Sequence, residues 1–261
     1  MPKPKVGIAL GAGGARGLAN LGVLQVLHEE GIPIHVVTGT SAGAVIGSLY
    51  SAGTDLAMIG RLAEELEWDD LTSFTLARKG LVSPDKIHSM LRVLTKDQDF
   101  EDLPIPTAVV ATDLLTGQEV VVDSGPIALG VRASLAIPGV FVPLELDGRL
   151  LVDGALVNRV PADLCHKMGA DVVIAVDVGW APLRGRIRNL PDVIMRTIDV
   201  LQRQVAQHKS IQADIVLEPE LGNVTITQLN RAREIIDKGR EVALANLANI
   251  KRQLELACMS K

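Results

Sequence analysis

The side chain best placed to do chemistry is Ser41, the centre of a G-x-S-x-G pentapeptide, Gly39-Thr40-Ser41-Ala42-Gly43. A β-branched apolar run at residues 34–37 precedes it, and small and apolar residues follow it, which predicts a buried strand leading into a tightly packed helix. On a strand-turn-helix this pattern is a nucleophile elbow, with the serine held out at a helix N-terminus. Gly39 and Gly43 suit a strained turn that neighbouring backbone passes closely. An ordinary Gly/Ser-rich turn is the alternative in a chain with 24 glycines.

A second glycine-rich loop, Gly11-Ala12-Gly13-Gly14-Ala15-Arg16-Gly17, follows an apolar strand predicted at residues 6–10. Leucines recurring every three residues over 18–27 predict a helix after it. The loop almost fits a dinucleotide fingerprint, but G-x-G-x-x-G counted from Gly11 requires glycine where Arg16 stands. The second predicted strand is also not followed by the acidic residue that would bind a ribose. A nucleotide site is therefore disfavoured.

The same loop fits better as an oxyanion hole beside Ser41. The backbone amides of Gly13 and Gly14 could point at the negative charge that develops when a serine attacks an ester carbonyl. The other residues would support the loop: Gly11, Arg16 and Gly17. In this interpretation Arg16 braces the loop rather than binding a ligand. An ordinary surface arginine at a helix start is the alternative.

A serine hydroxyl needs a general base near neutral pH, and the usual triad supplies histidine. The chain has five histidines, His28, His35, His88, His166 and His208. An α/β-hydrolase triad needs an acid and then a histidine after the nucleophile, and only His166 and His208 follow Asp153. Both lie in predicted amphipathic helices rather than at a strand end, so a histidine triad is the less favoured alternative.

Asp153 is better placed to be the base. It follows the apolar run Leu150-Leu151-Val152 at the end of a predicted strand, where α/β sheets collect functional residues. Gly154 and Ala155 leave room for a close approach of neighbouring groups. An Asp-Gly turn without a catalytic role is the alternative.

Strands and helices alternate along the rest of the chain. After the Ser41 elbow, strands are predicted at residues 107–112, 118–123, 149–152, 171–178 and 215–217. Helices are predicted at residues 55–67, 86–94, 126–136, 161–168, 191–212 and 228–257, the last interrupted by Gly239. The alternation predicts the α/β class: a three-layer α/β/α fold with a mostly parallel central sheet, in one domain over residues 1–261.

Composition narrows the possible partners and location. The net charge is −5 and aromatic residues are 2% of the chain, so a nucleic-acid binder is not expected. Two cysteines, Cys165 and Cys258, have no metal-ligand spacing and are expected to be ordinary thiols in a reducing, cytoplasmic setting. A signal peptide is not expected, because glycines and Arg16 interrupt the first apolar run.

Any contact with a membrane should be peripheral, because no apolar run reaches the roughly 18 residues of a transmembrane helix. With a cytoplasmic location, the expected side of the membrane is its inner face. Residues 71–82 mix apolar and basic side chains without a clear period. They could form a flap at the site entrance that touches a lipid surface, and an exposed helix could make such a contact instead. An ordinary packed loop is the alternative.

Three motifs in order resemble the patatin-like phospholipase family, and the short single-domain bacterial members most. They are Gly11-Ala12-Gly13-Gly14-Ala15-Arg16-Gly17, Gly39-Thr40-Ser41-Ala42-Gly43 and Asp153-Gly154-Ala155. Further likeness lies in Ala111-Thr112-Asp113, Arg132-Ala133-Ser134, Ile137-Pro138-Gly139-Val140-Phe141 and the helical tail at 228–245. The one departure is Ala12, where many members carry glycine.

The resemblance implies a Ser-Asp dyad that hydrolyses acyl esters of phospholipids or related lipids. Asp153 would take the proton of Ser41 directly, Ser41 would form an acyl-enzyme, and water would release the fatty acid. The amides of Gly13 and Gly14, with that of Ala42 as a further donor, would hold the oxyanion. No metal or cofactor is implied. Since a carboxylate is a weak base at neutral pH, partial burial is expected to raise the pKa of Asp153.

Two other functions are left open by the residues. An acyltransferase would use the same dyad and pass the acyl group to an alcohol instead of water. A lipid-sensing protein would bind acyl chains with little turnover, although the intact Ser41 and Asp153 count against it.

Overall fold

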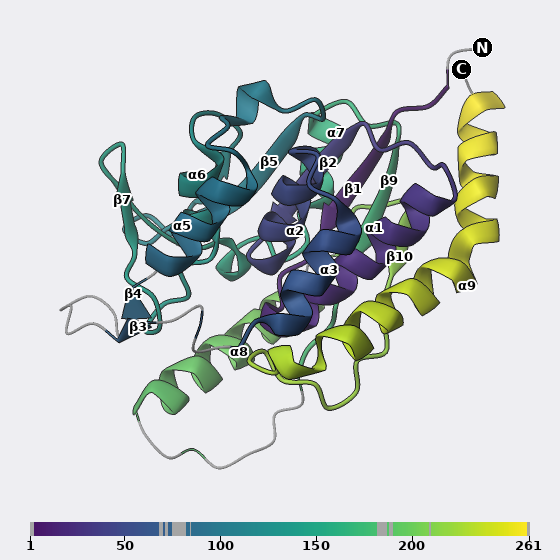
Figure 1. Ribbon diagram of the computed structural model, residues 1–261. Helices are drawn as coiled ribbons and strands as arrows, with labels where there is room; N and C mark the ends of the chain where they lie inside the picture. Colours follow the sequence, from purple (N-terminus) through teal and green to yellow (C-terminus); the bar gives the residue numbers. More distant parts are fainter. Residues whose placement is uncertain are drawn as a thin grey trace.

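The computed structural model describes residues 3–67, 70, 73–74, 82–83, 85–181, 187, 190–208 and 210–259. A mixed β-sheet with helices on both faces forms its centre (Figure 1). Parallel strands lie in the spatial order β10-β9-β1-β2-β5. They are β1 (Val6–Leu10), β2 (Val36–Thr40), β5 (Thr107–Asp113), β9 (Val172–Val176) and β10 (Ile215–Leu217). The predicted α/β class with a mostly parallel sheet is confirmed.

The far end of the sheet is antiparallel. It holds β6 (Glu119–Val122), β7 (Leu144–Leu146) and β8 (Arg149–Asp153). β6 and β8 both pair with β5, and β7 pairs with β8. The predicted hairpin of β5 and β6 is present.

Two strands share one edge of β5. β2 pairs with residues 107–110 of β5, and β8 pairs with residues 111–113. β6 takes the opposite edge, because Val109 pairs with Val122 as well as with Gly39. β2 is parallel to β5 and β8 is antiparallel to it, so these two strands run toward each other. Their carboxyl ends therefore meet at the middle of β5.

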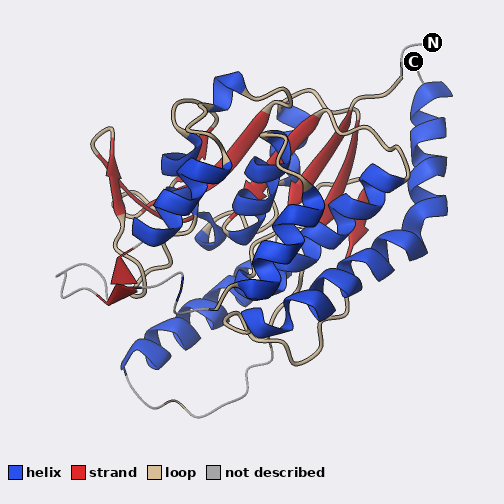
Figure 2. Ribbon diagram, viewed as in Figure 1, coloured by secondary structure: helices blue, strands red, loops and turns tan. Residues whose placement is uncertain are grey.

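Helices cover the two faces of the sheet unequally (Figure 2). One face carries α1 (Ala19–Glu29), α2 (Ala42–Ser51), α3 (Leu56–Glu65), α5 (Asp85–Leu94), α6 (Ile127–Ser134) and α9 (Ala232–Met259). The other face is covered by the short helix α7 (Ala162–Lys167). Along β1, Ile8 and Leu10 pack in the large core of the first face, and Ala9 packs against α7. Strands buried on both faces are almost wholly apolar for this reason.

Helix α8 (Leu190–His208) lies across the end of the molecule where the parallel strands terminate (Figure 1). It begins and ends close to the predicted helix at 191–212. Loops that follow β1, β2, β8 and β9 meet at this same end. In open α/β sheets, this edge is where ligands bind.

The prediction that Gly239 interrupts the last helix is wrong. A short 3-10 turn, η4 (Leu229–Arg231), leads into α9, which runs without a break from Ala232 to Met259. A Cβ on Gly239 would lie 2.0 Å from the carbonyl oxygen of Ala19, and one on Gly22 would lie 2.0 Å from that of Ile236. The two glycines therefore let α1 and α9 cross in close contact, and α9 keeps its hydrogen bonds through the crossing.

Most of the predicted flap at residues 71–82 lies outside the described residues. Within it, β3 (Ser73–Phe74) pairs with β4 (Val82–Ser83) in a short antiparallel ladder. Among the described residues, none of the helices combines the length and apolar character needed to cross a bilayer.

Candidate active site

Ser41 occupies the turn between β2 and α2 in a strained backbone conformation. Its φ is 55° and its ψ is −119°, a region that costs a residue other than glycine about 1–3 kcal/mol. A Cβ on Gly43 would lie 2.0 Å from the carbonyl oxygen of Leu10, so only glycine fits there. Gly39 is also constrained, since its Cβ would lie 2.6 Å from the carbonyl oxygen of Gly43. The turn has the form of a nucleophile elbow.

Ser41 is paired with Asp153. The hydroxyl of Ser41 donates a hydrogen bond to Oδ2 of Asp153 at 2.8 Å, and both residues are buried. The other carboxylate oxygen, Oδ1, accepts from the amide of Ala155 at 2.8 Å. Asp153 ends β8 and Ser41 follows β2, so the meeting of these two strands on β5 brings the pair together across 112 positions of sequence.

Burial changes the acid strength of Asp153. Loss of water around the carboxylate raises the pKa of Asp153 from 3.8 to about 6. The hydrogen bonds from Ala155 and Ser41 and the charge of Arg159 lower this pKa and offset part of the rise. Asp153 is thus mostly ionised at neutral pH and a stronger base than an exposed aspartate.

The glycine loop presents free amides at the same place. Gly13 and Gly14 line the cavity above the Ser41–Asp153 pair. The flanking amides are fixed, because Ala12 donates to the carbonyl oxygen of Arg159 at 3.0 Å and Ala15 to that of Ile226 at 2.8 Å. Within the described part of the chain, no acceptor is bonded to the amides of Gly13 and Gly14. These two N–H groups are available to an oxyanion.

Other loop residues pack the glycine loop against the elbow. The amide of Gly11 donates to the carbonyl oxygen of Val176 at 3.0 Å, which joins the loop to β9. A Cβ on Gly17 would lie 2.3 Å from Cβ of Ala42, the first residue of α2. The amide of Ala42 is one of the N-terminal helix amides that have no partner within the helix. It is a third N–H group beside Ser41.

Arg16 is buried and bonded to backbone. It lies in the 3-10 turn η1 (Gly14–Leu18). Its Nε and Nη2 donate to the carbonyl oxygen of Val178, at 3.1 and 2.8 Å, and its Nη1 donates to that of Val224 at 3.0 Å. The guanidinium therefore ties the glycine loop to the segments after β9 and β10. This geometry favours a bracing role over a ligand-binding one.

Arg16→Lys is expected to lower the free energy of unfolding by about 2–3 kcal/mol. A lysine cannot reproduce the fork that satisfies two carbonyl groups at once, and a buried acceptor left without a donor costs about 1–3 kcal/mol. Urea unfolding followed by circular dichroism measures the change. Unaltered stability together with a raised KM for substrate would instead assign Arg16 to ligand binding.

The described histidines lie away from Ser41. Of the described residues that line the cavity, none is a histidine. Nδ1 of His35 accepts a hydrogen bond from the amide of Val6 at 3.0 Å, at the opposite end of β1. His166 lies on α7, where its Nδ1 is 3.4 Å from the carbonyl oxygen of Ala170. The side chain of His208 lies outside the described ones.

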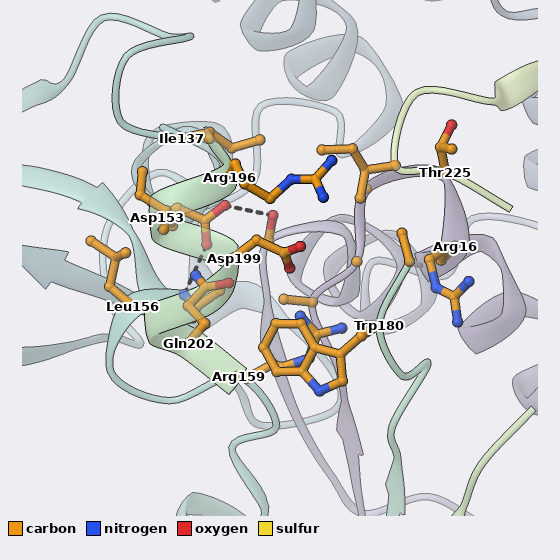
Figure 3. A pocket seen from close by; sticks show the side chains of 18 of the residues that line it. Arg16, Ile137, Asp153, Leu156, Arg159, Trp180, Arg196, Asp199, Gln202 and Thr225 are labelled. Atoms are coloured by element: carbon orange, nitrogen blue, oxygen red, sulfur yellow. Dashed lines mark hydrogen bonds between the residues drawn. The ribbon is translucent and has the colours of Figure 1, made fainter. Parts of the chain in front are cut away.

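A cavity of about 640 Å³ opens at the Ser41–Asp153 pair. Figure 3 shows Arg196, Asp199 and Gln202 reaching into it from α8. Apolar side chains contribute other parts of its wall: Ile137, Pro138, Leu156, Ile187, Ile198 and Ile226. The cavity thus combines a polar reaction centre with apolar surface, as small-molecule sites commonly do.

Sequence reasoning missed several residues of this site. Arg159 lies under Trp180, with its guanidinium carbon 3.9 Å from the ring centroid, and its Nε is 3.8 Å from Oδ1 of Asp177. The hydroxyl of Ser134 accepts a hydrogen bond from the amide of Ser41 at 2.8 Å. The only signal for Arg159 and Trp180 is that each comes shortly after a strand end, and this signal does not show that they meet.

The described residues include no group of three or more His, Cys, Asp or Glu side chains arranged to hold a metal ion. The cysteine nearest the site, Cys165, is buried beside Thr38, and burial raises the pKa of its thiol to about 12. Cys165 is therefore a poor nucleophile at neutral pH.

The fold and the site together define a class of α/β protein with a serine on a nucleophile elbow and an aspartate as its partner. The family model described as Patatin-like phospholipase matches residues 8–166, more than half of the chain and both Ser41 and Asp153. The chain belongs to the patatin-like phospholipase family.

Relatives extend from bacteria to animals. An NTE family protein of Mycobacterium tuberculosis, described as uncharacterized, is 41% identical over 184 residues, 67% of this chain and 49% of that protein. Patatin-like phospholipase domain-containing protein 7 of Rattus norvegicus is 37% identical over 67% of this chain and 14% of its own length. Neuropathy target esterase sws of Drosophila melanogaster is 34% identical over 67% of this chain and 13% of its own length. The matched region is thus about half of the mycobacterial relative and a small part of the animal ones.

Solved structures share the fold. The crystal structure of VipD from Legionella pneumophila matches 95% of this chain and 67% of that chain with a TM-score of 0.69 and 17% identity. The type III effector protein ExoU matches 98% of this chain and 54% of that chain with a TM-score of 0.54 and 16% identity. These matches support the three-layer fold alone.

Proposed function

We propose that this chain is a serine lipid acyl hydrolase in which Ser41 is the nucleophile and Asp153 the general base. The observation that carries the proposal is the 2.8 Å hydrogen bond from the hydroxyl of Ser41 to Asp153, made on a strained turn at the floor of a cavity. Strain of this kind concentrates at functional sites. Family membership and the esterase and phospholipase names of the relatives point to the same chemistry.

The reaction runs in two steps. Asp153 takes the proton of Ser41 while Oγ attacks the ester carbonyl, and the amides of Gly13 and Gly14 stabilise the oxyanion, with that of Ala42 beside them. Collapse of the tetrahedral intermediate breaks the ester bond, and the protonated Asp153 gives its proton to the leaving alcohol. Water then loses a proton to Asp153, attacks the acyl-serine and releases the fatty acid, and Ser41 regains its proton.

The cavity supports a lipid ester as substrate. Its volume of about 640 Å³ lies within the range of small-molecule pockets. Apolar side chains such as Leu156, Ile198 and Ile226 give an acyl chain surface to pack on. Arg159 and Arg196 lie in the same cavity as polar groups for the rest of the molecule. Phospholipids and lysophospholipids are the proposed substrate class.

Activity is expected to fall at acidic pH. Because the pKa of Asp153 is about 6, the carboxylate is increasingly protonated below pH 6 and cannot accept the serine proton. The value of kcat/KM should therefore decrease about tenfold per pH unit below about pH 6 and level off above it. A pH profile with a soluble p-nitrophenyl ester measures this. An acidic limb unchanged in an Asp153 variant with residual activity would assign that limb to another group.

Product analysis tests the proposed function. Wild-type protein is incubated with phosphatidylcholine, lysophosphatidylcholine and p-nitrophenyl esters of increasing acyl length, with and without an added alcohol, and Ser41→Ala is the control. Release of free fatty acid by wild type alone supports the hydrolase. Transfer of the acyl group to the alcohol would favour an acyltransferase. Tight lipid binding retained in Ser41→Ala, with no turnover by wild type, would favour a lipid sensor.

A further inference from the structure

The turn that ends helix α6 is hydrogen-bonded to both members of the Ser41–Asp153 pair. The hydroxyl of Ser134, the last residue of α6, accepts a hydrogen bond from the amide of Ser41 at 2.8 Å. Two residues later, the carbonyl oxygen of Ala136 accepts one from the amide of Asp153 at 2.9 Å. Ser134 and Ala136 are both buried, so water does not compete for either bond. Residues 134–136 are called the α6 turn.

The strand register explains why the amide of Ser41 needs this partner. The ladder between β2 and β5 ends at Thr40, which lies opposite Val110. From Ala111 onward, the same edge of β5 pairs with β8. The amide of Ser41 therefore lies outside the ladder, and a buried amide without an acceptor is costly. The hydroxyl of Ser134 supplies an acceptor at the point where the ladder ends.

The amide of Asp153 is in a similar position. β7 pairs with residues 149–151 of β8, so Asp153 lies two residues beyond the end of that ladder. The carbonyl oxygen of Ala136 accepts the amide of Asp153 there. The α6 turn thus holds the nucleophile and the base from two points that are two residues apart, and it sets how far apart their backbones lie.

The body of α6 holds this turn firmly. The helix packs against α2, β5 and β8, so it touches both the helix and the strand whose ends carry the pair. Ile127 and Val131 of α6 are fully buried in one core cluster. Directly after the turn, Ile137 and Pro138 line the cavity. The α6 turn therefore lies between the packed core and the reaction centre.

We propose that Ser134 is a positioning residue that holds Ser41 in its strained conformation and keeps its hydroxyl within reach of Asp153. This inference rests on the proposed function, because such positioning matters only if Ser41 is the nucleophile. The backbone of Ser41 has a φ of 55° and a ψ of −119°, and such conformations persist where surrounding contacts hold them. The bond to Ser134 is a contact of this kind, made by the amide of the strained residue itself. Without it, the turn is free to relax and carry Oγ of Ser41 away from Asp153 and from the oxyanion amides.

Single-turnover kinetics of Ser134→Ala with a soluble p-nitrophenyl ester test this role, because they separate ester binding from acylation. The rate constant of acylation is expected to fall by about 10- to 100-fold, since a displacement of about 1 Å at a reacting group can cost about 100-fold. The dissociation constant of the ester should change by less than about twofold, because Ser134 acts through the backbone of Ser41 and not on the substrate. Ser134→Thr, which keeps a hydroxyl, should restore most of the lost rate.

The matched control is Ser51→Ala at the other end of α2. Ser51 is also a fully buried serine, and its hydroxyl accepts a hydrogen bond from that of Thr107 at 2.7 Å. It lies roughly 15 Å from Ser41 along the helix. This variant loses a buried hydrogen bond without touching the elbow, so its acylation rate should equal that of wild type. Circular dichroism and melting temperatures verify that each variant is folded.

Amide hydrogen exchange at Ser41, followed by NMR, tests the same role without any substrate. Relative to the amides of β2, exchange at Ser41 should be faster by about tenfold or more in Ser134→Ala and unchanged in Ser51→Ala. A wild-type acylation rate in Ser134→Ala, a change in ester binding alone, an equal loss in Ser51→Ala or unchanged exchange at Ser41 overturns the inference. Full turnover by Ser41→Ala would instead overturn the proposed function, and the exchange measurement would still decide whether Ser134 holds the elbow.

Discussion

Ser41→Ala and Asp153→Asn are each expected to lower kcat/KM for ester hydrolysis by about 10⁴-fold. The first change removes the nucleophile. The second keeps the shape of the side chain, and the hydrogen bond with Ser41, but an amide cannot accept the serine proton. Oγ of Ser41 and Oδ2 of Asp153 are 2.8 Å apart, and both residues are buried. A water molecule is therefore poorly placed to take over the role of either side chain. Steady-state kinetics with a soluble p-nitrophenyl ester measure both effects.

The double variant Ser41→Ala/Asp153→Asn should be no less active than Ser41→Ala alone, because residues that act as one unit are not additive. His28→Ala and His166→Ala are the matched controls and should keep wild-type rates. A loss in His166→Ala as large as that in Asp153→Asn would contradict the Ser-Asp pair and favour a histidine base.

Asp153→Asn is also expected to make the protein more stable at alkaline pH, although the same substitution inactivates the enzyme. Burial raises the pKa of Asp153 from 3.8 to about 6, so the folded state binds this proton more tightly than the unfolded state. The stability contributed by the protonated group is fully present below about pH 4 and is lost as pH rises through about 6. A shift of about two pKa units corresponds to about 3 kcal/mol of folding stability. Wild type loses this stability when Asp153 ionises, whereas asparagine does not ionise and keeps it.

Urea unfolding at pH 8 and at about pH 4.5 measures this effect. Asp153→Asn should be more stable than wild type by up to about 3 kcal/mol at the higher pH, and the difference should shrink toward zero at the lower pH. Asp237→Asn, a change at an exposed position of α9, is the matched control and should alter stability by no more than about 0.5 kcal/mol at either pH. A variant less stable than wild type at pH 8 would show that the carboxylate is stabilised by its hydrogen bonds more than it is destabilised by burial.

The strands and the elbow could be predicted from local patterns. Residues 171–178 and 215–217 are apolar runs between turns, and they form β9 and β10. The glycines on either side of Ser41 predict a tight turn. The structure shows the reason, since a side chain on Gly43 would clash with the backbone of Leu10 and one on Gly39 with the backbone of Gly43. The position of Asp153 at the end of a strand is likewise local information.

The joining of the pair could not be derived from local patterns. Ser41 and Asp153 meet because β2 and β8 lie end to end on one edge of β5. Strand order and register depend on contacts between distant parts of the chain, and period and turn signals do not encode them. The strand-end position of Asp153 makes it a candidate base, and the resemblance to a known family implies its direct pairing with Ser41, but neither gives the register that brings the two side chains together.

The roles of α8 and Gly239 were missed for related reasons. The residues at 191–212 predict a helix, but which of its sides meets the cavity depends on how α8 is placed against the loops after β8 and β9. Glycine in a helical pattern is read as a break because of its low propensity. In α9, the close crossing with α1 outweighs that propensity.

The most direct test of the central claim is to trap the acyl-enzyme. Wild-type protein is mixed rapidly with a slow-turnover p-nitrophenyl ester, quenched in acid during the burst phase, and mapped by peptide mass spectrometry. The account predicts the mass of the acyl group on the peptide that contains Ser41, stoichiometric with the burst of p-nitrophenol and absent from Ser41→Ala. Acylation of another residue, or full turnover by Ser41→Ala, would contradict it.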